Sequence, residues 1–479
     1  MTEGSAVIGT NMGWLLVAAL GVIWVCLGVY WGRKAKTLDG FMVAGRNVGL
    51  ALGTATAVAT WITSNTTMLA PQFALQLGVW GIFAYSTASF GLFLFAPLAR
   101  RIRRLMPHGY TSVEFIRLRY GKVASVIFLV ISLFYSLTWM VSMGMAAGIL
   151  LEALAGIPYQ QGMSVVLLVC VLYTLFGGLY AVIGTDFIQS AIILVGLVVV
   201  AVTVLTAVPI GEVHANLQWK RPALLNVLFP AAIMAIFNNM LFGIGEVFHS
   251  NVWWSRVFAM REDVGWRAYL LAGLLWLPIP VVAGFLGLAA PALGINVTRP
   301  DVVGPVVAAS VLGYTGAVLV FIVVFCSLAS SIDSLLAATG DVVTKEIVAP
   351  LLMPNANDER LRKVAAVVIV TVGAITWGVC LPKVGTLATV LFFAGPLVGS
   401  TIWPILAGLY WKRASGEAAV VAMVLGSGVG LLAYFQIGWY TASLIGTGVS
   451  LLITVTVPVL LPGTFRWSQL CPQLQEVTT

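Results

Sequence analysis

The sequence predicts an all-α polytopic membrane protein, on three observations: its composition, its recurring apolar runs and the one-sided placement of its basic residues. Of its 479 residues, 60% are hydrophobic and only 9% are charged, and the mean hydropathy is +1.02. A soluble domain of this size needs more polar surface than this composition provides. Apolar runs long enough to cross a bilayer, about 20 residues each, recur to the end of the chain.

The apolar runs predict about thirteen membrane-spanning helices. Their expected bounds are 12–32, 47–71, 78–104, 123–156, 161–182, 186–209, 227–250, 267–292, 304–345, 362–381, 385–411, 417–436 and 440–461. The first run lacks a basic leading segment and a cleavage site, so we expect a retained helix and not a signal peptide. The ninth is too long for one crossing. We expect it to run on into the cytoplasm rather than to tilt strongly, because Asp341, Lys345 and Glu346 make its end polar.

Basic residues occupy alternate loops of this predicted topology. Those after spans 1, 3, 7, 9 and 11 are Arg33, Lys34, Lys36, Arg100, Arg101, Arg103, Arg104, Arg256, Arg261, Arg267, Lys345, Arg360, Arg362, Lys363, Lys412 and Arg413. Of the 25 lysines and arginines, those on the other face are Lys220, Arg221, Arg299 and Lys383. The positive-inside rule makes the basic loops cytoplasmic. We therefore expect an integral protein of the cell membrane (plasma or inner) with its N-terminus outside and its C-terminus inside. The topology accounts for the net charge of +8, so we predict no nucleic-acid partner.

Span 2 is interrupted by polar residues at its centre. Six hydroxyl or amide side chains fall within the eight positions from Thr60 to Thr67, and Pro71 follows. Such residues are costly in lipid unless they face a polar cavity, and transporters place solute and ion sites at interruptions of this kind. The alternative is a face of small hydroxylated residues that packs helices together.

Span 9 carries a stripe of hydroxyl groups. Ser327, Ser330, Ser331 and Ser334 are spaced i, i+3, i+4 and i+7, which places them on one helix face. Hard cations such as Na⁺ prefer a shell of oxygen atoms, so the stripe indicates a cation site; the alternative is hydrogen bonding between helices. Asp333 points elsewhere on the helix, and an acid within a membrane is a functional candidate.

Asp186 begins span 6, after the glycine pair Gly177-Gly178. An acid at the start of a helix is favoured by the helix dipole, so one interpretation is an N-terminal cap. The other is an acid that attracts a cation to an inner vestibule or releases it from there. The residues leave both open.

Span 7 repeats the features of span 2. It contains Asn238 and Asn239, then Gly243 and Gly245, where the helix is weakened, and then Glu246 and His249 at i and i+3. Because spans 2 and 7 lie five spans apart, each is expected to begin one of two inverted five-helix repeats. Glu246 and His249 are expected either to pair or titrate, or to serve at the membrane interface.

Aromatic residues on spans 4 and 11 form a further candidate set, and they are Tyr135, Trp139, Phe392 and Phe393. They could stack on a planar solute, or they could make ordinary lipid and packing contacts.

Two motifs in combination resemble the sodium/solute symporter family, over about residues 12–410. They are Gly-Gly-Leu followed by Thr185-Asp186 and Gln189, and the Ser-Ser-x-x-Ser segment of span 9. Within that family the chain is most similar to the high-affinity urea transporters of fungi and plants. The matching stretches are 44–49, 107–121, 254–256 and 268–274, with Trp276, Ile279 and Pro280.

The resemblance implies a LeuT-like core of ten helices as two inverted repeats. The chain would divide into an N-terminal helix (1–46), a first repeat (47–210), a second repeat (211–411) and two C-terminal helices with a short tail (412–479). It also implies a sodium site on the carbonyls of Ala59, Ile62 and Ser327 and the hydroxyls of Ser330 and Ser331. Asp186 matches the acid that lines the inner route of sodium.

Departures from the urea transporters bear on the ion and the solute. That group usually lacks the Thr-Asp pair that this chain keeps at Thr185-Asp186, which favours Na⁺ over H⁺ as the driving ion. It also usually has a small polar residue where this chain has Glu246, and an acid where this chain has Ser250.

We therefore expect a Na⁺-coupled symporter that imports a small polar nitrogenous solute, urea first, by alternating access. The expected solute contacts are Thr63, Ser64, Asn65, Tyr135, Trp139, Asn239, Glu246 and Phe392. The alternatives are choline, proline or a similar solute, with Glu246 as the countercharge of a cation, or H⁺-coupled uptake of urea.

Proteins of other classes are less well supported. A channel would show a pore motif or charged rings, and a sensor would normally append a soluble domain. An enzyme would need a nucleophile–base or metal constellation, whereas the three histidines are scattered. The cysteines, Cys26, Cys170, Cys326, Cys380 and Cys471, lie far apart, which indicates neither a disulfide framework nor a metal site. We expect no cofactor and no metal other than Na⁺.

Overall fold

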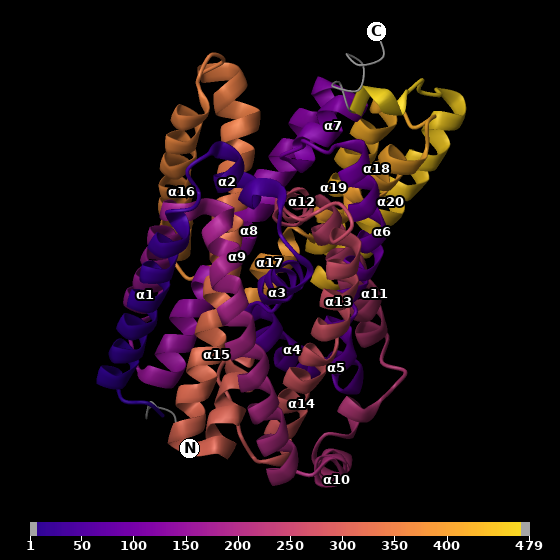
Figure 1. Ribbon diagram of the computed structural model, residues 1–479. Helices are drawn as coiled ribbons and strands as arrows, with labels where there is room; N and C mark the ends of the chain where they lie inside the picture. Colours follow the sequence, from indigo (N-terminus) through magenta and orange to yellow (C-terminus); the bar gives the residue numbers. More distant parts are fainter. Residues whose placement is uncertain (1–6, 471–479) are drawn as a thin grey trace.

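The computed structural model describes residues 7–470, which form one helical bundle (Figure 1). Within them the only β-type pairing is an isolated bridge between Val48 and Met260. The helices up to the middle of the chain are α1 (Thr10–Gly32), α2 (Leu38–Val43), α3 (Leu50–Trp61), α4 (Ser64–Leu77), α5 (Val79–Ser86), α6 (Ser89–Leu105), α7 (Ser112–Tyr120), α8 (Lys122–Ala155), α9 (Tyr159–Ala207) and α10 (Ile210–Lys220).

The second half of the chain continues the bundle. Its helices are α11 (Pro230–His249), α12 (Asn251–Ala259), α13 (Gly265–Trp276), α14 (Pro278–Ala292), α15 (Val303–Val343), α16 (Asp358–Cys380), α17 (Leu387–Phe393), α18 (Gly395–Tyr410), α19 (Gly416–Gln436) and α20 (Trp439–Leu460). The shorter helical turns are η1 (Ala44–Arg46), η2 (Pro222–Leu225), η3 (Pro300–Val302), the π-helix η4 (Thr344–Leu352) and η5 (Trp467–Leu470).

The predicted crossings all have counterparts in this bundle. Eleven helical stretches in the described part of the chain are long and apolar enough to span a membrane. Two of the thirteen predicted spans share α9, which leaves the helical conformation at Gly178 (φ 51°). One more is the interrupted pair α3 and α4, whose members have 12 and 14 residues. The all-α polytopic class is confirmed.

Span 9 owes its length to a break that the sequence analysis missed. Gly313 has φ 67° and interrupts α15, so the segment before it is separate from the long crossing helix. The helix also continues beyond Val343 as the π-helix η4, at the end where we expected the extension. The extra length is therefore divided between both ends of the predicted span.

The broken helices lie at the centre of the bundle (Figure 1). α3 and α4 are in the middle, α1 and α16 pack with α9 and α15 on one side, and α18, α19 and α20 form the opposite side. Large apolar side chains such as Val130, Val198 and Leu452 are exposed on the outer surface of the bundle. Exposed apolar side chains on this scale are suited to lipid and not to water.

Four cysteines lie within the described residues, and all four are free: Cys26 is exposed, and Cys170, Cys326 and Cys380 are buried. Cys471 lies outside the described residues.

Candidate functional site

The break between α3 and α4 is built by the threonines that made span 2 look interrupted. Ile62 leaves the helical conformation (ψ 86°). The Thr63 hydroxyl then accepts from the Thr66 backbone N–H, and the Thr66 hydroxyl accepts from the Thr63 N–H, each at 3.2 Å. This reciprocal cap satisfies the N–H groups that begin α4 inside the protein.

The same break leaves the backbone carbonyls of Ala59 and Ile62 without a backbone partner in the described part of the chain, whereas the two carbonyls between them accept hydrogen bonds from side chains. The carbonyl of Thr60 accepts from the Ser331 hydroxyl at 3.3 Å, and that of Trp61 accepts from the indole of Trp276 at 2.7 Å. Among the described residues, no backbone N–H crosses the break to the carbonyls of Ala59 or Ile62. These two are the carbonyls that the family resemblance assigns to sodium.

The serine stripe of α15 contacts the end of α3 through Thr60 and the second half of α9 through Asp186. The Ser331 hydroxyl donates to the carbonyl of Ser327 at 2.9 Å, and the Ser330 hydroxyl donates to Oδ1 of Asp186 at 2.5 Å. All members of the stripe are buried. The structure thus brings together the five residues expected to bind sodium, with Asp186 beside them.

Asp186 is not a helix cap, because α9 is helical from Leu179 onward and Asp186 lies inside that segment. Its carboxylate forms a fully buried ion pair with Arg256, at 3.1 Å between Oδ2 and Nη2. The Thr56 hydroxyl donates to the same oxygen at 2.5 Å. The capping interpretation is therefore wrong, and the acid lies in a polar centre within the bundle.

Arg256 is a site residue that the sequence analysis placed in a cytoplasmic loop. Its Nη2 also donates to the hydroxyls of Thr60 and Ser334, each at 2.7 Å. It reaches them because α12 continues inward after a break at Ser250, which has an extended conformation (ψ 131°). The signal was available in the glycines and polar residues of span 7, but we ended that span at residue 250.

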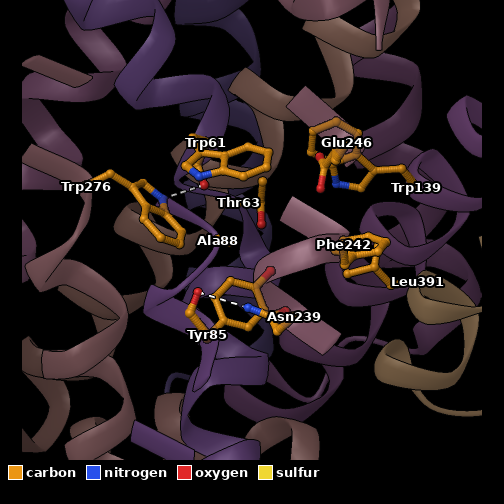
Figure 2. Close-up of a pocket in the computed structure, with 10 residues that line it drawn as sticks. All are labelled: Trp61, Thr63, Tyr85, Ala88, Trp139, Asn239, Phe242, Glu246, Trp276 and Leu391. Carbon is orange, nitrogen blue, oxygen red and sulfur yellow. Dashed lines mark hydrogen bonds between the residues drawn. The ribbon is translucent and has the colours of Figure 1, made fainter. Parts of the chain in front are cut away.

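Next to the break, a cavity is lined by residues of α3, α5, α8, α11, α13 and α17 and by two residues between helices (Figure 2). The lining consists of Trp61, Thr63, Tyr85, Ala88, Trp139, Asn239, Phe242, Glu246, Trp276 and Leu391. Its volume is about 10 Å³, which is close to the space that one water molecule requires. Only a very small solute would fit without movement of these side chains.

Four of the expected solute contacts line this cavity, namely Thr63, Trp139, Asn239 and Glu246. Ser64 and Asn65 instead contact α8: the Ser64 hydroxyl donates to the sulfur of Met143 at 3.1 Å, and Asn65 Oδ1 accepts from Ser142 at 3.1 Å.

The two remaining expected contacts lie behind the lining. The ring of Tyr135 is 5.6 Å from that of Trp139. The ring of Phe392 packs at 4.9 Å from Phe242 and stacks at 5.0 Å on Trp439. Tyr135 and Phe392 thus pack against residues that line the cavity and do not line it themselves.

The aromatic wall contains four residues that were not among the predicted solute contacts: Trp61, Tyr85, Phe242 and Trp276. The ring of Trp61 lies 6.3 Å from that of Trp139 and 5.8 Å from that of Trp276. Trp61 directly precedes the helix break, and this position was a usable signal. Tyr85 and Trp276 are distant in sequence and gave none.

The expected pairing of Glu246 with His249 is wrong. The Nε2 atom of His249 lies 3.0 Å from the Ser132 hydroxyl, and its ring packs 4.4 Å from Phe128. Asp333 also lacks a strong partner: its Oδ1 accepts from Ser334 at 3.3 Å, and its Oδ2 is buried without one.

Outside the membrane-spanning helices, a polar cluster holds the start of α3. Arg46 forms an ion pair with Asp39 at 3.1 Å, donates to the carbonyl of Gly109 at 2.9 Å and lies over the ring of Tyr110. Burial raises the pKa of Asp39, but hydrogen bonds from Tyr110 and Arg46 lower it by more. Burial, together with the hydrogen bond to Asp39, raises the pKa of Tyr110 to about 12. Val48 then pairs with the end of α12, through its N–H and the Ala259 carbonyl at 3.0 Å.

Two interrupted helices around a polar centre define the class of membrane transporters with broken helices. Comparison with known families shows that residues 41–426 match the model of the sodium:solute symporter family. The chain therefore belongs to this family.

Among similar proteins is the urea-proton symporter DUR3 of Oryza sativa subsp. japonica, which is 26% identical over 91% of this chain. The chain spans only 66% of the length of that protein. The osmoregulated proline transporter OpuE of Bacillus subtilis is 26% identical over 90% of this chain and 89% of its own length.

Solved structures show the same fold. A Na⁺-coupled sialic acid symporter superimposes with a TM-score of 0.79 at 18% identity, over 95% of this chain and 99% of that one. The nucleobase–cation symporter Mhp1 superimposes with a TM-score of 0.56 at 15% identity, over 88% and 94%. The LeuT-like architecture is thereby confirmed.

Proposed function

We propose that the protein is a Na⁺-coupled symporter that imports a small polar nitrogenous solute, with urea as the first candidate. The observation that carries this proposal is the turn from Ala59 to Thr63. Within residues 7–470, the carbonyls of Ala59 and Ile62 accept no backbone hydrogen bond, and the Thr60 carbonyl between them accepts from Ser331 of the serine stripe. Trp61 and Thr63 of the same turn line the solute cavity. The turn from Ala59 to Thr63 thus belongs to both proposed sites. A sodium ion bound to its carbonyls would order the part of the cavity wall that Trp61 and Thr63 form.

The proposed sodium ligands are the carbonyls of Ala59, Ile62 and Ser327 and the hydroxyls of Ser330 and Ser331. All are neutral oxygens, which suits Na⁺ and offers a proton no acid or base to bind. Asp186 lies next to this shell through its hydrogen bond with Ser330. We assign it to the route by which Na⁺ leaves, with Arg256 covering it in the present conformation.

Urea is supported by the chemistry of the cavity lining and by the rice relative, whose name gives urea as its solute. Asn239 and Glu246 offer acceptors for N–H groups, and the hydroxyls of Thr63 and Tyr85 can donate to a carbonyl. Ser64, Asn65, Tyr135 and Phe392 support this wall from behind. Proline or another small solute is the second candidate, since a similar Bacillus protein is a proline transporter.

The orientation in the membrane is part of the same proposal. The end of the bundle with α2 and α7 would be cytoplasmic, and transport would run by alternating access to the central cavity (Figure 1). The division into an N-terminal helix, two repeats and two C-terminal helices at residues 46, 210 and 411 remains a prediction.

The test is uptake of labelled urea into proteoliposomes with an inward gradient of Na⁺ or, as control, K⁺. We expect Na⁺-dependent uptake that falls about tenfold or more in Ser330→Ala, because a lost cation ligand costs at least about 1.4 kcal/mol. Ser310→Ala, on the same helix but before Gly313, is the matched control and should transport normally.

Uptake that proceeds equally in K⁺, or that Ser330→Ala leaves unchanged, would contradict the ion site. Uptake of labelled proline but not urea would retain the symporter and replace the solute.

A further inference from the structure

Glu246 is a buried acid without a positively charged partner among the described residues. The residue is 4% exposed, its Oε1 makes no hydrogen bond, and it lines the solute cavity. Within residues 7–470, no lysine, arginine or histidine nitrogen lies within 4 Å of its carboxylate. The nearest ionisable side chains on neighbouring helices are the hydroxyls of Tyr85 on α5 and Tyr135 on α8, which supply no positive charge. His249, one turn further along α11, is engaged by Ser132.

A carboxylate in such surroundings requires compensation. Leaving an ion unpaired in a low-dielectric interior costs several kcal/mol, so the occupant of the cavity is expected to supply the missing positive charge. A mobile proton or an organic cation could do so.

The walls of the cavity favour an organic cation over a proton. Three tryptophans and a tyrosine surround the space next to Glu246: Trp61, Trp139, Trp276 and Tyr85 (Figure 2). Aromatic faces attract organic cations through the negative potential of the ring, and indole does so most strongly. A proton bound to Glu246 would gain nothing from these rings.

The fixed amide of Asn239 adds a second acceptor. Its Nδ2 donates to the carbonyls of Ala84 at 2.7 Å and Tyr85 at 3.2 Å, so its N–H groups are used by the backbone of α5 (Figure 2). Its Oδ1 is therefore the atom left for a solute. Two acceptors, Glu246 and Asn239, suit a ligand that carries only N–H donors.

We propose that this cavity binds small planar cations of the guanidinium class, with Glu246 as their countercharge, more tightly than it binds neutral urea. Guanidinium has the planar shape and size of urea but replaces the carbonyl by a third N–H group and carries one positive charge. The cavity, at about 10 Å³, must widen to admit guanidinium, and a flat cation of this size requires less widening than a bulkier quaternary amine. The inference rests on the proposed function only in taking this cavity as the solute site.

The test compares urea and guanidinium chloride at millimolar concentrations on wild type, Glu246→Gln and Glu212→Gln. Glu212 is an exposed acid on α10 and serves as the matched control. One readout is competition against uptake of labelled urea, and the other is the shift in unfolding temperature of the purified protein in detergent.

In the wild type and the control, guanidinium should compete at about tenfold lower concentration than unlabelled urea. In Glu246→Gln its affinity should fall about 30-fold or more, because a buried charge pair is lost. The affinity for urea should fall by a smaller factor than that for guanidinium, because urea carries no charge and the amide of Gln still accepts an N–H.

The outcomes separate this inference from the proposed function. Urea uptake that guanidinium does not inhibit would overturn the inference and leave the urea symporter in place. Guanidinium binding that depends on Glu246, without any urea transport, would uphold the inference and replace the solute. Uptake of urea that requires a proton gradient and is abolished by Glu246→Gln would assign a proton to Glu246 and overturn the inference.

Discussion

Arg256 places a fixed, buried positive charge beside the proposed sodium site. Its Nη2 lies among oxygens of Thr60, Asp186 and Ser334, while the proposed sodium ligand Ser330 donates to the same carboxylate. Asp186 therefore pairs with the fixed cation Arg256 and is hydrogen-bonded to a proposed ligand of the mobile one. On the proposed exit route, release of Na⁺ toward Asp186 requires the ion pair between Asp186 and Arg256 to weaken.

Replacing Arg256 by Gln tests this arrangement. Breaking one partner of a buried ion pair costs about 3–5 kcal/mol, so Arg256→Gln should lower the unfolding temperature clearly. Na⁺ should recover part of that loss, because a ligand that binds only the folded state stabilises it. The measurement is thermal unfolding in detergent at matched NaCl and KCl concentrations.

The control for this variant is Arg267→Gln, which removes an exposed arginine of α13. If Arg256→Gln unfolds at the wild-type temperature, or gains no more from NaCl than the control does, the buried pair does not have the role assigned to it.

At the scale of elements, the fold depends on where its helices stop. Threonine caps form the break between α3 and α4, and Ser250 forms the break between α11 and α12. Gly178 separates the two crossings within α9. Each break is encoded by one or two residues. Single substitutions there should act on the whole bundle.

Gly178 offers the sharpest case, because its φ of 51° lies in the left-handed region and a Cβ there would meet the Phe41 carbonyl at 2.5 Å. Gly178→Ala should therefore reduce the yield of monodisperse protein severely, as judged by size-exclusion chromatography. Gly448→Ala in α20 is the matched control, since a Cβ at that glycine meets nothing within 4 Å. A normal elution profile for Gly178→Ala would show that the turn tolerates a side chain.

The cluster around α2 makes a prediction about pH. The pKa of Asp39 is lowered in the folded protein, so this group contributes stability above its unfolded pKa of about 3.9 and loses it as pH falls. Asp39→Asn should be less stable than wild type near pH 6, and the difference should shrink toward pH 3. The measurement is the unfolding temperature across that range. A difference that grows as pH falls would have the wrong sign.

At the scale of the whole molecule, much of the architecture was predictable because the membrane imposes long apolar runs and a one-sided distribution of basic residues. The serine stripe and the interrupted span 2 were readable for the same reason, since hydroxyl groups at mid-span stand out against apolar neighbours. The site role of Arg256 could not be recognised in the same way. It lies on α12, a helix of nine residues that is too short to span a membrane, and an arginine there suggests a cytoplasmic loop.

Other parts of the site could not be predicted from local pattern. Tyr85 and Trp276 join Trp61 only through the packing of α5 and α13 against the centre, and aromatic residues are common in every span. The sequence likewise could not show that Asn65 and Phe392 lie behind the cavity wall, because both carry side chains that suit a solute site.

The central claim is that the turn from Ala59 to Thr63 couples a sodium site to a solute cavity. The most direct measurement is equilibrium binding of labelled urea to purified protein across a range of Na⁺ concentrations, with Na⁺ affinity measured in turn across a range of urea. The account predicts that each ligand raises the affinity of the other by the same factor, as thermodynamic linkage requires. Urea binding that is saturable but independent of Na⁺ would contradict it.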